Sequence, residues 1–259
     1  MTLVLVGRLM SHRMEPILAT QETAEPSSAA VVNVSGGPEN EPRPVASAWH
    51  TVVVLVMLGI LSYRGQVRLA QFRTLGDLSR VGLYERVIVT QWVMLGLVLF
   101  GVWLHGSSMY TVLGPRWRSP GSFLREFGIG MGFLVVAIMV GSILGHGGDR
   151  SITNLILPQG GRESWMWAAL AVTAGICEET IYRGYLQRQF VAFTKSVPAG
   201  ILVSAALFGA GHLYQGIGGA LSIAVLGALA GALAHWCKSV RPGMIAHSLQ
   251  DLLGAIVRH

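Results

Sequence analysis

Two adjacent carboxylates and an arginine follow an apolar run near the middle of the chain. The run 164–172 reads SWMWAALAV and leads into TAGICEETIYRG, which contains Glu178, Glu179 and Arg183. A charged side chain at the centre of a membrane helix costs about 2.5–3.5 kcal/mol on insertion scales, so such residues are rare and usually face a protein interior or a water-filled cavity. These three residues therefore need either partners or a function.

In a helix, the side chains of Glu178 and Glu179 would point in different directions. Glu179 and Arg183 are four residues apart, which places them on one helix face and predicts a structural ion pair. Glu178 points about 100° away from Glu179 around the helix axis, so it cannot share the arginine equally well. Glu178 has no obvious local partner and is the stronger candidate for chemistry.

Two further apolar segments carry ionisable residues. LFGAGHL (207–213) contains Phe208 and His212, and MIAHSLQDLLGAIV (244–257) contains His247 and Asp251, four residues apart. Taken singly, His212 fits an interfacial position, and His247 and Asp251 could satisfy each other by hydrogen bonding. Three such segments in one chain favour a single polar pocket, because intramembrane ionisable groups tend to face a common interior. The expected members are Glu178, Glu179, His212, His247 and Asp251.

The composition indicates a membrane protein. Hydrophobic residues make up 52% of the chain and charged residues only 12%, whereas soluble domains carry about 25% charged residues. The 33 glycines fit closely packed membrane helices. The net charge of +6 comes without a basic run interleaved with aromatics, so we expect no nucleic-acid partner. Two cysteines in or beside apolar segments do not make a disulfide framework.

The apolar runs predict an all-α fold, a polytopic transmembrane helical bundle of about seven spans around a polar intramembrane cavity. The expected spans are roughly 48–63, 87–105, 127–145, 163–179, 198–214, 217–237 and 241–257, since a bilayer needs about 20 apolar residues per helix. Residues 180–195 fit a helix at the interface or tucked between spans. Residues 1–47 are predicted to be a disordered tail, because 20–47 are rich in Pro, Glu, Ser and Ala. A transmembrane domain then covers 48–259, with its motif-bearing core at 163–257.

The three polar segments resemble the motifs of a known family. Glu178, Glu179 and Arg183 form EExxxR, Phe208 and His212 form FxxxH, and His247 with Asp251 forms HxxxD, a variant of HxxxN. These motifs, in this order, resemble those of the CPBP family of intramembrane proteases, which includes the type II CAAX prenyl endopeptidases. The resemblance covers about residues 165–257 and implies a bundle of mostly transmembrane helices around a hydrophilic cavity.

Hydrolysis of a peptide bond needs an activated water and a group that stabilises the oxyanion. The chain has no HExxH zinc motif, and no Ser or Cys in the matched motifs has an evident base, so a glutamate-activated water remains. The resemblance implies that Glu178 is the base, that His212 helps to orient or activate the water, and that His247 and Asp251 polarise the scissile carbonyl. Glu179, Arg183 and Phe208 would support them.

Asp251 departs from the prenyl-protease pattern, which has Asn at this position. An Asn amide can donate a hydrogen bond to an oxyanion, and an ionised aspartate cannot. Two alternatives follow. In one, Asp251 is protonated and donates; in the other, it is ionised and orients His247.

Two other functions compete with a glutamate-dependent protease. A zinc ion held by Glu178, His212 and His247 would give a metalloendopeptidase, because catalytic zinc takes three protein ligands plus water. The ligands lack the tight spacing of a strong zinc motif, so we expect no cofactor, with zinc as the alternative. A non-enzymatic bacteriocin-immunity or regulatory membrane protein on the same scaffold is the other competitor.

The expected partners are the lipid bilayer and a peptide or protein substrate reached from the membrane. The compact size is typical of a bacterial protein, for which we expect the inner (cytoplasmic) membrane.

Overall fold

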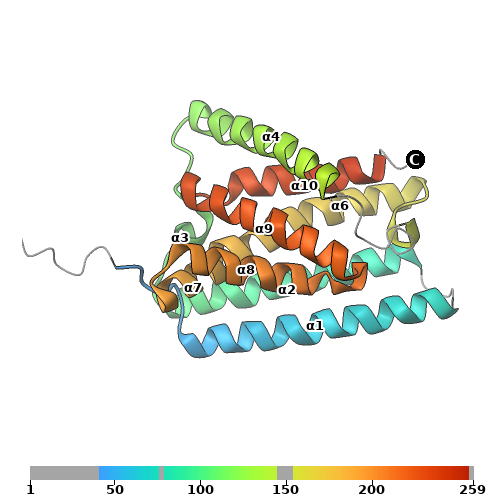
Figure 1. The fold of residues 1–259 in the computed structure, drawn as a ribbon, viewed down its shortest axis with the longest axis horizontal. Coiled ribbons are helices and arrows are strands. Elements are labelled where there is room, and N and C mark those ends of the chain that lie inside the picture. Colours follow the sequence, from blue (N-terminus) through green and yellow to red (C-terminus); the bar gives the residue numbers. More distant parts are fainter. Residues whose placement is uncertain (1–40, 76–78, 145–153, 257–259) are drawn as a thin grey trace, which may run out of the picture. The chain divides into compact units, whose positions relative to one another are not determined.

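The computed structural model describes residues 41–75, 79–144 and 154–256, and all regular elements within these ranges are helical (Figure 1). They are α1 (Ala48–Leu75), α2 (Arg80–Leu104), α3 (Met109–Leu113), α4 (Pro120–Ile143), α6 (Gly161–Glu178), η2 (Glu179–Leu186), α7 (Gln187–Thr194), α8 (Val197–Gly211), η3 (Leu213–Gln215), α9 (Ile217–Cys237) and α10 (Arg241–Ile256). The predicted all-α class is confirmed for this part of the chain.

Four helices in the described ranges are long and apolar enough to cross a membrane, namely α1 over Ala48–Phe72, α2, α4 and α9. The expected number of about seven spans is not confirmed. The helices α6, α8 and α10 have 18, 15 and 16 residues, fewer than the approximately 20 that a bilayer requires. The chain is nevertheless an integral membrane protein, and the motif residues lie on or beside its shorter helices.

Serine residues cap the starts of α2 and α4, where the sequence passes from a polar loop into an apolar helix. Ser79 accepts a hydrogen bond from the backbone N–H of Gly82 at the start of α2. Ser119 and Ser122 form a reciprocal capping box at α4, with Pro120 as the first helical residue. Such caps satisfy backbone N–H groups that have no partner within the helix, so these starts are encoded locally.

The elements that carry the motifs pack closely together. α6 packs against α2 and α10, α10 also packs against α4, and α8 packs against α9. In Figure 1, α4 lies beside α10 at one edge of the bundle, and α1 lies at the opposite edge. The three polar segments of interest therefore come from neighbouring helices.

Glycine allows α6 and α10 to approach each other. A Cβ atom on Gly175 of α6 would lie 2.8 Å from the carbonyl oxygen of Met244 in α10 and would also overlap the side chain of Ser248. Small residues of this kind let membrane helices come into backbone contact. Gly175 precedes Glu178 by less than one turn, so this contact sets the distance between the carboxylate of Glu178 and the polar residues of α10.

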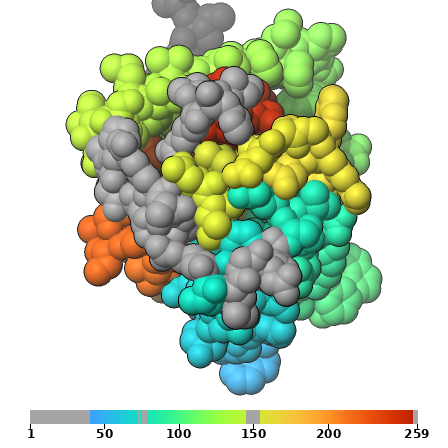
Figure 2. All heavy atoms as spheres, turned by 90° about the vertical axis from the view of Figure 1, so that its right-hand side faces the viewer, coloured from blue at the N-terminus to red at the C-terminus, as the bar shows by residue number. Residues whose placement is uncertain are grey.

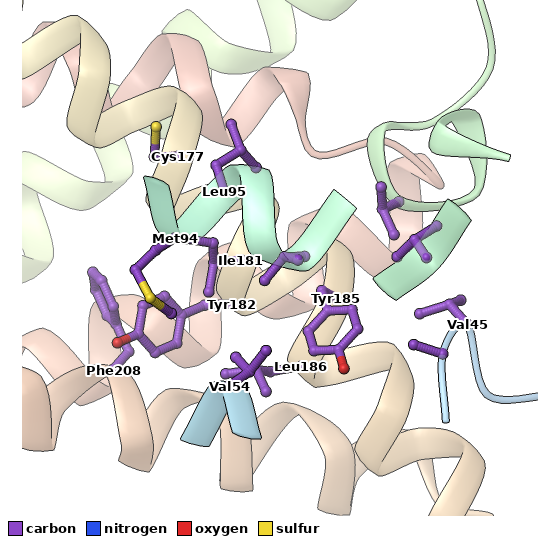
Figure 3. Close-up of a cluster of buried hydrophobic side chains, with 14 residues drawn as sticks. Val45, Val54, Met94, Leu95, Cys177, Ile181, Tyr182, Tyr185, Leu186 and Phe208 are labelled. Atoms are coloured by element: carbon purple, nitrogen blue, oxygen red, sulfur yellow. The ribbon is translucent and has the colours of Figure 1, made fainter. Parts of the chain in front are cut away.

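A buried hydrophobic cluster packs around η2, as Figure 3 shows. Its side chains include Ile181, Tyr182, Tyr185 and Leu186 of η2, Val54 of α1, Met94 and Leu95 of α2, Cys177 of α6 and Phe208 of α8. Because η2 contributes to this cluster on one side and to the charged residues on the other, the same packing that buries the apolar side chains fixes the charged ones.

The segment before α1 is anchored to α7. The fully buried side chain of Gln189 accepts a hydrogen bond from the backbone N–H of Val45 (2.7 Å) and donates one to the carbonyl of Ala46 (2.9 Å). Packing thus begins before the predicted domain start at residue 48. The remainder of the predicted tail, 1–40, lies outside the described residues.

The start of α6 is tied to the start of α2. Arg80 pairs with Glu163 at 3.8 Å, and Arg162 pairs with Glu85 at 3.8 Å. Figure 2 shows this end of the molecule, where the first turns of α6 lie beside α2. These contacts fix the register of the two helices, which run parallel to each other.

We expect Gly175→Ala to destabilise the protein, because the added methyl group would force α10 away from α6. Overpacking of this kind costs about 1–3 kcal/mol. The matched control is Gly96→Ala in α2, since a Cβ there meets nothing within 4 Å. Thermal unfolding in detergent should show a lower midpoint for Gly175→Ala only. Equal midpoints for the two variants would contradict the close contact.

Candidate active site

The paired glutamates lie at the junction of two helix types. Glu178 is the last residue of α6, and Glu179 begins the π-helical element η2, in which the N–H of Gln187 bonds to the carbonyl of Tyr182. The i→i+5 pattern widens the turn, and such insertions are frequent at functional sites. A change of helix type therefore falls directly between the two carboxylates.

Glu179 is the buried member of the pair. Its Oε1 lies 3.0 Å from Nη1 of Arg183, and each of these two side chains is only 3% exposed. The guanidinium stands 4.2 Å from the centre of the Phe208 ring, a cation–π contact that suits a desolvated arginine. The ion pair expected from the four-residue spacing is present, and Phe208 supports its positive partner.

Glycines surround this ion pair. A Cβ atom on Gly243 of α10 would lie 2.8 Å from Oε2 of Glu179, and one on Gly227 of α9 would lie 3.1 Å from Nη2 of Arg183. Both glycines lack the atom that would press on the charged groups. The pair is therefore enclosed by backbone from two other helices.

Glu178 is the accessible member of the pair. Its side chain is 17% exposed, against 3% for Glu179. Oε1 accepts a 2.7 Å hydrogen bond from Nε2 of Gln91 in α2, and Oε2 lies 3.8 Å from Nε2 of His247. Glu178 thus has one oxygen held by an amide and a second oxygen with space around it.

Gln91 did not figure among the sequence-predicted residues. It lies 87 residues before Glu178, so no local spacing connects them. A weaker signal was available, because Gln91 is a polar residue inside the apolar run 87–105. The same criterion had selected the histidines.

His247 lies among three carboxyl groups. Its Nδ1 is 3.2 Å from Oε1 of Glu179, where the imidazole N–H donates to the carboxylate. Its Nε2 is 3.8 Å from Glu178 and 3.7 Å from Asp251. The last two distances exceed hydrogen-bonding range. The partner that orients His247 is therefore Glu179, and the direct His247–Asp251 hydrogen bond considered from the sequence is absent.

The charges around His247 do not balance. Glu178, Glu179 and Asp251 supply three carboxyl groups within 4 Å of the imidazole, and Arg183 supplies one guanidinium. Excess charge in an apolar environment is costly, and buried groups take up or release protons in response. We therefore expect this cluster to hold at least one additional proton.

His212 ends α8 and presents one free nitrogen. Its Nδ1 lies 2.9 Å from the carbonyl oxygen of Phe208. A carbonyl can only accept, so Nδ1 carries the hydrogen and a neutral ring leaves Nε2 as an acceptor. The His212 ring also packs edge-on against the Phe208 ring, with 4.8 Å between centres. Phe208 thus contacts both His212 and Arg183.

One cavity of about 1200 Å³ connects these groups. Its lining includes Glu178, His212, His247 and Asp251. Most of the remaining lining residues are apolar, and many of them come from α1 and α2. The space therefore combines an apolar wall with a small group of polar residues, as expected of a site for an apolar ligand with one reactive polar group.

The residues of the zinc alternative do not fit a metal site. Within the described ranges, no group of three or more His, Cys, Asp or Glu side chains is arranged to hold a metal ion. Glu178, His212 and His247 share a cavity without converging on one point.

Comparison with known proteins agrees with the motifs. Residues 160–253 match the model of the family described as type II CAAX prenyl endopeptidase Rce1-like. This region contains every motif residue from Glu178 to Asp251 and confirms the resemblance drawn from the sequence. Searches of curated proteins and of solved structures found no match.

Arg183→Ala should act mainly on stability. Removal of the guanidinium leaves the carboxylate of Glu179 buried without its partner, which costs about 3–5 kcal/mol. The control is Arg162→Ala, because the side chains of Arg162 and Glu85 are 79% and 54% exposed and exposed pairs contribute about 0–1 kcal/mol. The detergent melting midpoint should fall only for Arg183→Ala. A stable but inactive Arg183→Ala protein would instead indicate a direct role in catalysis.

Proposed function

We propose that the chain is an intramembrane endopeptidase that hydrolyses a peptide bond with a water activated by Glu178. The observation that carries this proposal is the asymmetry of the paired carboxylates. Glu179 is enclosed in an ion pair at 3% exposure, whereas Glu178 is 17% exposed and lines a cavity together with His212, His247 and Asp251. The family match over residues 160–253 supports a peptidase.

In this mechanism, the water binds at Oε2 of Glu178. Oε1 is engaged by Gln91, so Oε2 is the oxygen that takes a proton from water as the water oxygen bonds to the carbonyl carbon of the substrate. The resulting tetrahedral oxyanion then collapses, and the C–N bond breaks. Glu178 returns the proton to the leaving nitrogen. The products are a new carboxyl end and a new amine.

His212 and His247 have different parts in this scheme. The free Nε2 of His212 accepts a hydrogen from the water and helps to orient it. Nε2 of His247, when protonated, faces Glu178 and Asp251 across 3.7–3.8 Å, and a small polar group placed between them could accept its hydrogen. Donors aimed at a developing oxyanion are usually the largest single contribution to catalysis.

Asp251 fits the role of a second donor better than that of an orienting anion. Glu179 already binds Nδ1 of His247, so the imidazole is oriented without Asp251. The Asp251 side chain is 37% exposed and lines the cavity. A protonated Asp251 would donate to the same oxyanion as His247.

We also propose the cofactor requirement, the type of substrate and the cellular location of the enzyme. The enzyme uses no metal, and its substrate is a peptide or protein segment that enters the cavity from the bilayer. Nucleic acid is not a partner. We place the protein in the inner membrane of a bacterium. The largely apolar lining of the cavity is the feature that favours an apolar substrate.

Glu178→Gln should abolish cleavage while the protein still folds, because an amide cannot take a proton from water. Loss of a general base lowers the rate by about 10²–10⁴-fold. Glu163→Gln is the control, since Glu163 lies at the other end of α6 and pairs with Arg80. The assay follows cleavage of a farnesylated CAAX peptide by purified protein, together with proteomics of precursors that accumulate in a deletion strain. Normal cleavage by Glu178→Gln at normal expression would refute the assignment, and a scaffold function without catalysis would then be favoured.

Asp251→Asn tests the donor role. An Asn amide keeps a donor and the shape of the side chain, so we expect cleavage to continue. Any loss of rate that wild type shows at higher pH should become smaller, because an amide does not titrate. A pH–rate profile checks this expectation. If the rate drops strongly at every pH in a folded variant, Asp251 acts as an anion instead, as with other orienting carboxylates that an amide cannot replace.

A further inference from the structure

Gln91 lies outside the family-matched region 160–253 and contacts Glu178. Its Nε2 donates to Oε1 of Glu178 over 2.7 Å, a length typical of a strong hydrogen bond to an ionised group. A carboxylate only accepts, so the nitrogen of the amide must face Glu178 and the amide oxygen must face elsewhere. The orientation of Gln91 is therefore fixed by Glu178.

The other end of the Gln91 amide has no partner among the described residues. Oε1 of Gln91 is buried and accepts no hydrogen bond, while the side chain lines the cavity. A buried carbonyl without a donor costs about 1–3 kcal/mol, so a donor that arrives with a ligand would bind favourably. A peptide brings such a donor in every backbone N–H.

The Gln91–Glu178 contact is not needed to hold α2 against α6. Arg80 and Glu163 already join the starts of these helices, and Nε1 of Trp92 donates to Thr173 at 3.3 Å one residue further along α2. Gln91 lines the cavity beside Glu178, and its buried Oε1 has no hydrogen-bond partner among the described residues. The packing of α2 against α6 therefore does not account for the polar groups of Gln91.

We propose that Gln91 is a positioning and substrate-binding residue, which holds Oε1 of Glu178 through its nitrogen and accepts a backbone N–H of the peptide substrate through its oxygen. The inference rests on the proposed function. Gln91 leaves Oε2 of Glu178 as the oxygen that receives the proton of water. It also places the peptide chain beside that oxygen, so one side chain sets the positions of both the base and the scissile bond.

Two variants separate these roles from packing. Gln91→Leu keeps an apolar side chain of similar length and removes both the donor and the acceptor. Thr173→Val is the matched control, because it removes the hydrogen bond from Trp92 between the same two helices without contact to Glu178. Both are made in the full-length chain and compared in melting midpoint.

The first measurement needs no substrate. An infrared difference spectrum between a protein and its Glu178→Gln variant isolates the carboxylate bands of Glu178. We expect these bands to shift in the Gln91→Leu background and to stay unchanged in the Thr173→Val background. Unshifted bands in Gln91→Leu would overturn the contact with Glu178, whatever the activity.

The second measurement uses the farnesylated CAAX peptide as the probe. Loss of a hydrogen bond to a charged group costs enough to lower kcat/KM about 10- to 100-fold. In Gln91→Leu, we expect kcat to fall because the base is misplaced and KM to rise because the substrate N–H loses its acceptor. Thr173→Val should keep wild-type values. A Gln91→Leu protein with wild-type kcat and KM would overturn the proposal.

The variant Gln91→Glu tests the contact through the pH dependence of cleavage, which a purely structural role of residue 91 would not alter. A second carboxyl beside Glu178 disfavours its ionised form, so the acidic limb of the pH–rate profile should move to higher pH. His247, Glu179, Asp251 and His212 also lie at this site, and they remain in both proteins, so the variant is compared directly with wild type. An unmoved limb would contradict a contact between residue 91 and the base.

The outcomes distinguish this inference from the proposed function. If wild type neither cuts nor binds the probe but the infrared bands shift, the proposed function and the substrate-binding part fail, and the positioning contact stands. If wild type cuts the probe and Gln91→Leu does so equally well, the proposed function stands and this inference fails.

Discussion

The buried ion pair between Glu179 and Arg183 is the interaction on which the site depends. One oxygen of this carboxylate contacts both Arg183 at 3.0 Å and His247 at 3.2 Å. The first contact keeps η2 in one conformation, and the second attaches α10 to it. Arg183 in turn lies on the ring of Phe208 in α8. Three helical elements are thus oriented by one buried anion, which leaves its neighbour Glu178 free to face the cavity.

A buried charge of this kind needs partners, because an unpaired charge is costly in the interior. Oε1 of Glu179 has Arg183 as a near neighbour in sequence and His247 as a distant one, whereas Oε2 has no hydrogen-bond partner among the described residues. The hydrophobic cluster around η2 supplies the rigid support, since Tyr182 packs edge-on against Phe208 with 4.9 Å between ring centres. The Phe208 ring therefore contacts both the charged group of Arg183 and the hydrophobic cluster.

Local spacing was enough to predict part of this arrangement. The Glu179–Arg183 pair follows from a four-residue interval, and the grouping of Glu178 with the histidines follows from the cost of ionisable groups in apolar helices. Contacts between helices could not be predicted, because the periodicity of apolar residues does not determine which residues of two packed helices lie opposite each other. Gln91 was missed for this reason, and Glu179 was not recognised as the partner of His247. The number of about seven spans is not confirmed, because α6, α8 and α10 are shorter than a typical membrane-spanning helix.

The glycines at the site change what a motif for this fold should contain. Gly175, Gly227 and Gly243 each stand where a single methyl carbon would press on α10 or on the charged pair. These glycines contribute by having no side chain, and motifs that specify only charged, histidine and phenylalanine positions do not include them. A search or a redesign that keeps EExxxR, FxxxH and HxxxD but fills these three positions would preserve the reactive groups and lose the space between them. These three glycine positions therefore belong in a motif for this fold as much as the carboxylates do.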